Sequence, residues 1–187
     1  RAALLAASPE PDILVNNTGG PPPGSVLDVA PDVWCSQFDV MVVRLFELGR
    51  LLVPPMRGRG WGRVLIVTSM GVVQPIPGLG ISNALRAAIV GWNKTLADEV
   101  AADGVTANIL APGRIATDRL RQINEATATR QGKSVDDVVS ESIGTIPARR
   151  FGRPEEFANV AAFLCSDAAS YVTGSVIRCD GGAVRSV

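Results

Sequence analysis

The chain has 187 residues, of which 47% are apolar and 19% are charged, and this length is enough for one α/β domain with a packed core. Lys and Arg together number 18, as do Asp and Glu, so the charge balance gives no reason to expect nucleic acid or an anionic membrane as a partner. No apolar run reaches the roughly 18 residues that a bilayer-spanning helix needs, and no secretory signal opens the chain.

Histidine is absent from the sequence, which removes the commonest general base and the commonest metal ligand and excludes a Ser-His-Asp hydrolase. The three cysteines, Cys35, Cys165 and Cys179, are widely spaced and form no Cys-x-x-Cys pair. We therefore expect no disulfide framework and no metal site. The three thiols are expected to be buried and to lie in a reducing, cytoplasmic compartment.

Strand and helix patterns alternate along the chain. The sequence predicts strands over 12–17, 63–68, 105–110 and 175–179, and helices over 1–7, 32–53, 81–102 and 154–166. The second helix is expected to end before the Pro54-Pro55 pair, and the third at Asp103-Gly104. The polar stretch 114–142 predicts one or two surface helices in an extended loop.

This alternation predicts an α/β fold: a Rossmann-like, doubly wound parallel sheet with helices on both faces. Ligands of such sheets bind outside the carboxyl ends of the strands. The segments expected at these ends are 16–19, 68–69, 111–113 and 180–182. They are the first places to look for a binding or catalytic site.

Six segments, in the same order and the same strand–helix context, resemble the short-chain dehydrogenase/reductase family. They are NNTG (16–19), Ser69 at a strand end, APGRIAT (111–117), RFGRPEE (150–156), FLCSDAASYVTG (163–174) and CDGG (179–182). Within that family the chain looks most similar to 3-oxoacyl-(acyl carrier protein) reductase-like members. The resemblance implies a domain that binds NAD or NADP and transfers a hydride to or from a small carbonyl or acyl substrate.

The resemblance also implies that part of the fold is not in this chain. The family's first βαβ units carry a Gly-rich turn that holds the cofactor pyrophosphate, and no such turn follows a strand here. The glycines of 58–62 precede a strand, so we interpret them as an ordinary turn. With a start at Arg1 instead of Met, we expect 1–187 to be one domain, the C-terminal part of such a Rossmann domain, and the 12–17 strand to have an open edge.

The family's catalytic positions hold unusual residues. Ser69 matches the family serine, but thirteen residues later the tyrosine position holds Ser82, and four residues further the lysine position holds Arg86. The position of the relay asparagine, seven residues after Trp34, holds Met41. A serine hydroxyl is too weakly acidic to replace a phenol, and a thioether holds a water poorly. Arg86 stays charged and can still bind a ribose diol, but it cannot shuttle a proton.

The resemblance also implies the positions that contact the cofactor. They are Asn16, Gly19, Arg86, Pro112, Gly113, Ile115 and Thr117. Asn16 is expected to brace the sheet more than to contact ligand, and Pro-Gly is also an ordinary turn after a strand. Tyr171, the only tyrosine, is expected to be a packed structural residue.

Two functions remain open at this point. One is an NAD(P)-dependent oxidoreductase of the short-chain type with altered catalytic residues, and the other is a non-catalytic protein that binds a nucleotide, a ligand or a partner on the same fold. The helices over 32–53 and 81–102 resemble the pair that builds the family's four-helix interface. An apolar stripe through Leu85, Ile89 and Trp92 has the spacing of such a helix face. We therefore expect a homodimer or a homotetramer.

Overall fold

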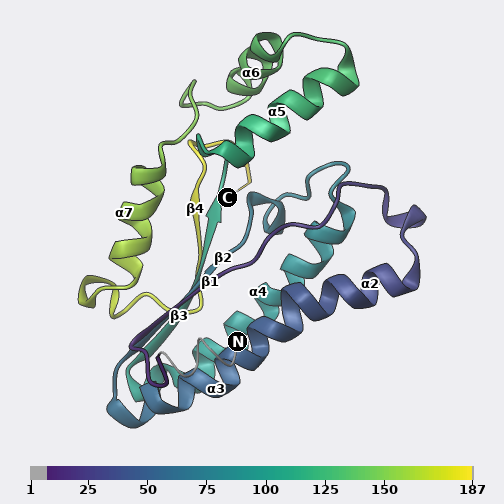
Figure 1. Ribbon diagram of the computed structural model, residues 1–187. Helices are drawn as coiled ribbons and strands as arrows, with labels where there is room; N and C mark the ends of the chain where they lie inside the picture. The colour runs from purple at the N-terminus through teal and green to yellow at the C-terminus, as the bar shows by residue number, and fades with distance from the viewer. Residues whose placement is uncertain (1–7, 187) are drawn as a thin grey trace.

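Four parallel strands form one sheet in the computed structural model, which describes residues 8–186. The strands are β1 (Ile13–Asn17), β2 (Gly62–Val67), β3 (Val105–Pro112) and β4 (Val176–Cys179), and they lie side by side in chain order. Their register sets Val15 opposite Leu65 and Leu65 opposite Asn108. Helices cover both faces of this sheet (Figure 1), as the alternating pattern predicted. The predicted helix over 1–7 lies outside the described residues.

One face of the sheet is covered by the longest helices. These are α2 (Pro31–Phe38), which runs through a π-helical turn, η2 (Asp39–Val43), into α3 (Arg44–Arg59), and α4 (Gly80–Val100). Every second strand residue points into this layer because side chains alternate across a strand. Leu14, Val64 and Ile66 pack there against Leu85 and Ile89 of α4. The predicted apolar stripe of α4 therefore belongs largely to the core.

Of the described residues, the other face carries the helix α7 (Pro154–Leu164) and the short 3₁₀ helix η5 (Asp167–Ala169). Leu65 and Leu110 pack there against Leu164 and Ala169. This layer does not reach β1, where Ile13 and Val15 are 42% and 53% exposed. Among the described residues β1 pairs only with β2, so its outer edge is open as expected.

Helices α5 (Asp118–Gln131) and α6 (Val135–Gly144) lie beyond the carboxyl end of β3 (Figure 1). The prediction of one or two surface helices in this stretch is confirmed, and there are two. Thr117 and Ser134 cap them, because each hydroxyl accepts a hydrogen bond from an amide in the first turn. Three further 3₁₀ turns complete the fold: η1 (Val26–Asp28), η3 (Met70–Val72) and η4 (Ala101–Asp103).

The expected end of the second helix before Pro54 is wrong, because α3 continues through both prolines to Arg59. The prolines remove the hydrogen bonds to the carbonyls of Arg50 and Leu51, but these residues are exposed and water can reach those carbonyls. Met56, directly after Pro55, is completely buried beneath the sheet. Its burial offsets the local cost, and the helix ends instead at Gly60, whose φ of 70° suits glycine.

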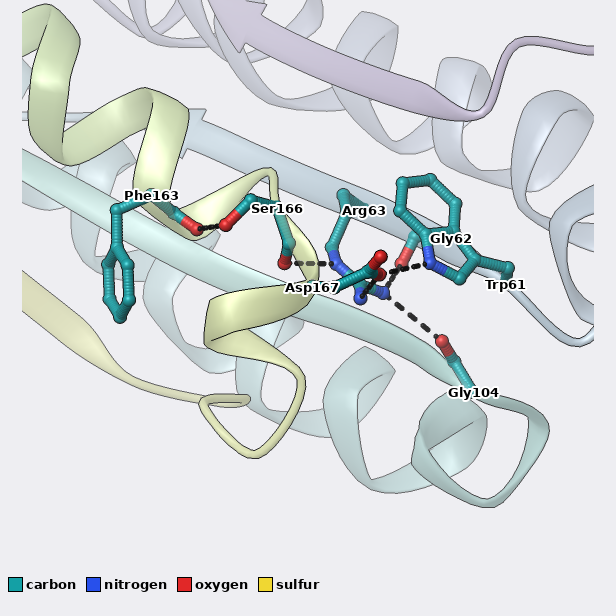
Figure 2. Close-up of polar contacts among 7 residues, drawn as sticks. All are labelled: Trp61, Gly62, Arg63, Gly104, Phe163, Ser166 and Asp167. Carbon is teal, nitrogen blue, oxygen red and sulfur yellow. Dashed lines mark hydrogen bonds and ion pairs between the residues drawn. The ribbon is translucent and has the colours of Figure 1, made fainter.

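A buried arginine ties the amino end of β2 to the segment after α7 (Figure 2). Arg63 is 2% exposed and lies 4.3 Å above the Trp61 ring. Its guanidinium donates to the carbonyl oxygens of Ser166 at 3.2 Å, Gly62 at 2.8 Å and Gly104 at 3.3 Å, and to Asp167 at 3.3 Å. The Trp61 indole donates to the same carboxylate at 2.8 Å. This Arg63 cluster lies at the sheet end opposite to the strand ends where ligands bind.

Two predictions about single side chains are wrong. Tyr171 is fully exposed in the turn after η5, so it does not pack in the core. Of the thiols, Cys35 is exposed, and Cys165 and Cys179 are only partly buried beside Leu65 and its neighbours. Burial raises the pKa of both of these partly buried thiols. All three thiols are free, as predicted. Within 8–186 no helix is long and apolar enough to cross a membrane.

Candidate active site at the carboxyl edge of the sheet

The carboxyl ends of β1 and β2 bring together most of the residues that the sequence singled out. Ser69 follows β2 and caps η3, where its Oγ accepts a hydrogen bond from the Gly71 amide at 3.1 Å. This bond occupies the hydroxyl oxygen and leaves the Ser69 proton free for an acceptor in the site.

Ser82 and Arg86 lie one turn apart on α4. Arg86 Nε donates to Ser82 Oγ at 3.3 Å. The two ends of the guanidinium reach across the sheet to the carbonyl oxygens of Val67 and Gly19, each at 3.3 Å. Arg86 therefore links α4 to the ends of both β2 and β1, and its hydrogen bond to Ser82 Oγ fixes the position of that hydroxyl oxygen.

The Arg86 guanidinium is buried, with 7% of the residue exposed. Burial lowers its pKa from the usual value because a charged group loses water there. The pKa of an arginine starts so high that the group stays protonated at neutral pH. The site therefore holds a permanent positive charge that neither gives up nor takes a proton.

Asn16 and Thr68 are buried at the same strand ends and face the α4 layer, since each lies two residues beyond a core residue of its strand. Neither Asn16 Nδ2 nor Thr68 Oγ1 has a hydrogen-bond partner among the described residues. Met41, the residue at the relay asparagine position, is 2% exposed and packs in the core below. It offers no hydrogen bond worth counting to a relay water.

The end of β3 forms a second wall of the site. Gly113 donates to the Cys179 carbonyl at 2.9 Å, and a Cβ on this glycine would lie 2.6 Å from Asp180 Cα. Only glycine therefore allows the two strand ends to approach this closely. Ile115 pairs with Gly152 in an isolated bridge, which holds the segment after Pro112 in an extended form.

Thr117 caps the first turn of α5. Its hydroxyl accepts from the Leu120 amide at 3.4 Å and donates to the Ile115 carbonyl at 3.4 Å. A cavity of 650 Å³ opens beside it between α5 and α6, closed on one side by Phe151. The predicted cofactor-side residues 112–117 thus follow the end of β3 towards this cavity, and the Ser82–Arg86 pair lies on α4.

Sequence reasoning missed Asn83, which shapes the loop between Ser69 and Ser82. Its amide donates to the Ile76 carbonyl at 2.9 Å and accepts from the Ile76 amide at 3.3 Å. A Cβ at Gly71 would lie 2.7 Å from Asn83 Oδ1, so the glycine leaves room for this contact. An Asn directly after Ser82 was the only available signal, and its loop partner Ile76 is seven residues away on a segment without periodicity.

The comparisons with known proteins agree with this architecture. A family model described as Enoyl-(Acyl carrier protein) reductase matches residues 2–184. "Dehydrogenase/reductase SDR family member 4" of Oryctolagus cuniculus is 38% identical over 173 residues, which are 92% of this chain and 63% of that protein. "3-oxoacyl-[acyl-carrier-protein] reductase FabG" of Salmonella typhimurium is 34% identical over 175 residues, which are 92% of this chain and 66% of that protein.

Among solved structures, L-sorbose reductase from Gluconobacter frateurii complexed with NADPH and L-sorbose superposes with a TM-score of 0.91 and 32% identity. That match covers 100% of this chain and 71% of the reductase. The chain belongs to the short-chain dehydrogenase/reductase family. It spans less than two thirds of the length of the first curated relative.

Proposed function

We propose that this protein is an NAD(P)-dependent oxidoreductase acting on a carbonyl or hydroxyl group, with 3-oxoacyl compounds as candidate substrates and with altered catalytic residues. The observation that carries the proposal is the direction of the hydrogen bonds made by the two serine hydroxyls. Ser69 accepts from a backbone amide and Ser82 accepts from Arg86, so both hydroxyls keep a proton to donate. Two O–H donors at one sheet edge suit the oxygens of a carbonyl substrate.

Residues of this chain fit a nicotinamide cofactor at the same edge. Three of the five guanidinium N–H groups of Arg86 bind protein oxygens, which leaves two for a ribose diol. The backbone at Gly19 is open, since a Cβ there would meet no atom within 4 Å. Asn16, Pro112, Gly113, Ile115 and Thr117 complete the proposed cofactor side by resemblance. The bound cofactor would supply or accept the hydride, and NADPH in the sorbose reductase structure supports NADP as the first choice to test.

The proton path differs from that of the family. Ser82 cannot act as an acid near neutral pH, Arg86 keeps its proton, and Met41 cannot hold a relay water. We therefore assign the proton to solvent, with Ser69 and Ser82 orienting the substrate. General acid catalysis is worth roughly 10²–10⁴-fold, so its loss slows turnover without abolishing it.

A triple variant tests the proposal. Ser82→Tyr, Arg86→Lys and Met41→Asn together are expected to raise kcat by about 10²–10⁴-fold, because they restore a phenol, an ammonium group and a relay amide. NADPH oxidation with a panel of 3-oxoacyl thioesters and simple ketones measures the effect. Ser69→Ala in the triple background is the control, and it should remove the gain. A wild-type protein that already reduces these substrates at ordinary reductase rates would contradict the impaired proton path.

The second candidate is a non-catalytic protein on the same fold, and the loss of three relay residues together favours it. Titration of the protein with NADPH separates the two. Tight cofactor binding with no turnover on any carbonyl, even in the triple variant, would support the binding protein.

We also propose a homodimer or homotetramer in the cytoplasm. Exposed apolar side chains along α2 and η2 support the assembly: Val33, Phe38 and Val40 are 37%, 39% and 60% exposed. Phe38 also lines a hollow of 360 Å³, together with Trp34, Cys35, Asp39, Val43 and Leu85. Three free thiols support a reducing compartment.

A further inference from the structure

Arg86 is buried, and among the described residues no carboxylate lies against it. Its three protein contacts are all neutral oxygens, those of Ser82, Val67 and Gly19. No acidic side chain of the described residues forms an ion pair with it, and burial is the only influence on its pKa. Arg63, which is buried as deeply, has Asp167 at 3.3 Å.

A buried charge without a counter-charge is costly, and proteins normally pair it or use it to hold a ligand. A ribose diol would use the spare donors of Arg86 but would leave its charge unpaired. An anionic group would satisfy both, because charge-assisted hydrogen bonds from arginine to carboxylate are about twice as strong as neutral ones.

Ser82 is the route by which this charge meets a substrate. Arg86 Nε holds the Ser82 oxygen, so the hydroxyl proton points to another acceptor. Ser82 is only partly buried, whereas Arg86 behind it is 7% exposed. A group that accepts from Ser82 therefore lies one hydrogen bond away from a permanent cation, and an anionic oxygen is favoured there over a neutral one.

We infer that the Ser82–Arg86 pair makes this site selective for substrates that carry a carboxylate close to the reacting carbonyl, that is, 2-oxo or 3-oxo acids. Ser82 donates to the carboxylate with the guanidinium behind it, while Ser69 donates to the reacting carbonyl oxygen. The inference rests on the proposed reductase function. According to this inference, Ser82 and Arg86, which replace the family's tyrosine and lysine, remove the proton donor and also create an acid-binding group.

Matched pairs of acid and ester test the inference. 2-Oxobutanoate and acetoacetate are each compared with their methyl esters, at saturating NADPH, and the ratio of kcat/KM for acid over ester is measured. The wild-type protein is expected to prefer the acid by about tenfold or more, from the difference between charged and neutral hydrogen bonds. Arg86→Gln should bring the ratio close to one, Arg86→Lys should keep part of it, and Ser82→Ala should reduce it without removing the cation.

Arg119→Gln is the matched control for loss of one positive charge. Arg119 is exposed, lies near Gly20 at the same edge, and forms no ion pair within 8–186. Its variant should keep the acid preference. An equal drop in Arg119→Gln would show a diffuse field instead of a specific site and would overturn the inference.

Binding measured without turnover separates the two proposals. The shift in Tm produced by each acid and each ester is recorded with NADPH present, and it also shows whether each variant is folded. Stabilisation by the acids alone, lost in Arg86→Gln and reduced in Ser82→Ala, supports the acid site even when no substrate turns over and the reductase proposal fails. Turnover of esters at least as fast as acids leaves the reductase proposal standing and refutes the acid site.

Discussion

Glu156 shows how one side chain can combine the start of a helix with an ion pair. Its carboxylate accepts from Arg150 at 2.7 Å through both oxygens and from the Arg153 amide at 2.8 Å. These bonds, with that from Arg150 as the largest cause, lower the pKa of Glu156 to about 2. The sequence indicated acids in this first turn, but only the fold brings Arg150 onto the same carboxylate.

This shifted pKa predicts a defined acid sensitivity. Because the folded-state pKa lies below the usual 4.5, the ionised form favours the fold; its contribution is complete above about pH 4.5 and is lost as the pH falls towards about 2. Glu156→Gln should therefore lower Tm above that window and flatten the decline of Tm within it. Thermal melts across these pH values measure the effect. Glu155→Gln is the control, since Glu155 makes no side-chain bond to the described residues; a similar flattening there would contradict the assignment.

At the proposed site, the sequence identifies the residues themselves, but it does not predict the hydrogen bonds they make. Ser69, Ser82 and Arg86 were found by counting along the chain, and the structure places Arg86 against Ser82 and against both strand ends. The direction of their hydrogen bonds was not predictable, because it depends on Gly71 in η3 and on Gly19 in the loop after β1. The exposure of Tyr171 was missed for a similar reason: a turn residue shows no periodicity from which burial can be inferred.

The elements follow their sequence patterns closely, and their ends depend on packing. The strands and α4 begin and end within two residues of the prediction, because alternation, Gly104 and flanking polar residues are local signals. The failure at α3 has a tertiary cause, since the burial of Met56 carries the helix past two prolines. The tertiary packing of a buried side chain next to the prolines therefore overrides their low helix propensity.

The join between β2 and η5 gives a prediction at the same scale. Arg63→Met should destabilise the protein by about 2–4 kcal/mol, because the buried Gly62 carbonyl and the carbonyls of two partly buried contacts lose a donor. Asp167→Asn should cost less than about 1 kcal/mol, since the Asp167 side chain is 86% exposed and its ion pair is screened by water. Urea unfolding of both variants measures the difference. Equal losses would mean that the ion pair, and not the carbonyl contacts, stabilises the join.

At the scale of the whole molecule, the exposed apolar face of α2 and η2 predicts self-association. Light scattering at micromolar concentration should give the mass of a dimer or a tetramer. Val40→Asp together with Phe38→Asp should shift the protein towards monomer, because a charge on each side of a contact between copies is costly to bury. Ile123→Asp, an exposed apolar residue on α5, is the control and should leave the mass unchanged. A wild-type monomer would refute the proposed assembly.

The sequence by itself determined the class of fold, the family and which residues stand at the positions that the family resemblance marks as catalytic, because periodicity, strand-end motifs and spacing are local properties. Only the tertiary structure decided what those residues do to one another. Folding brings Arg86 beneath the ends of two strands and behind Ser82, with no acid beside it among the described residues. Burial turns an arginine that spacing identifies only as a substituted lysine into an unpaired charge, and that charge favours an acid as the substrate.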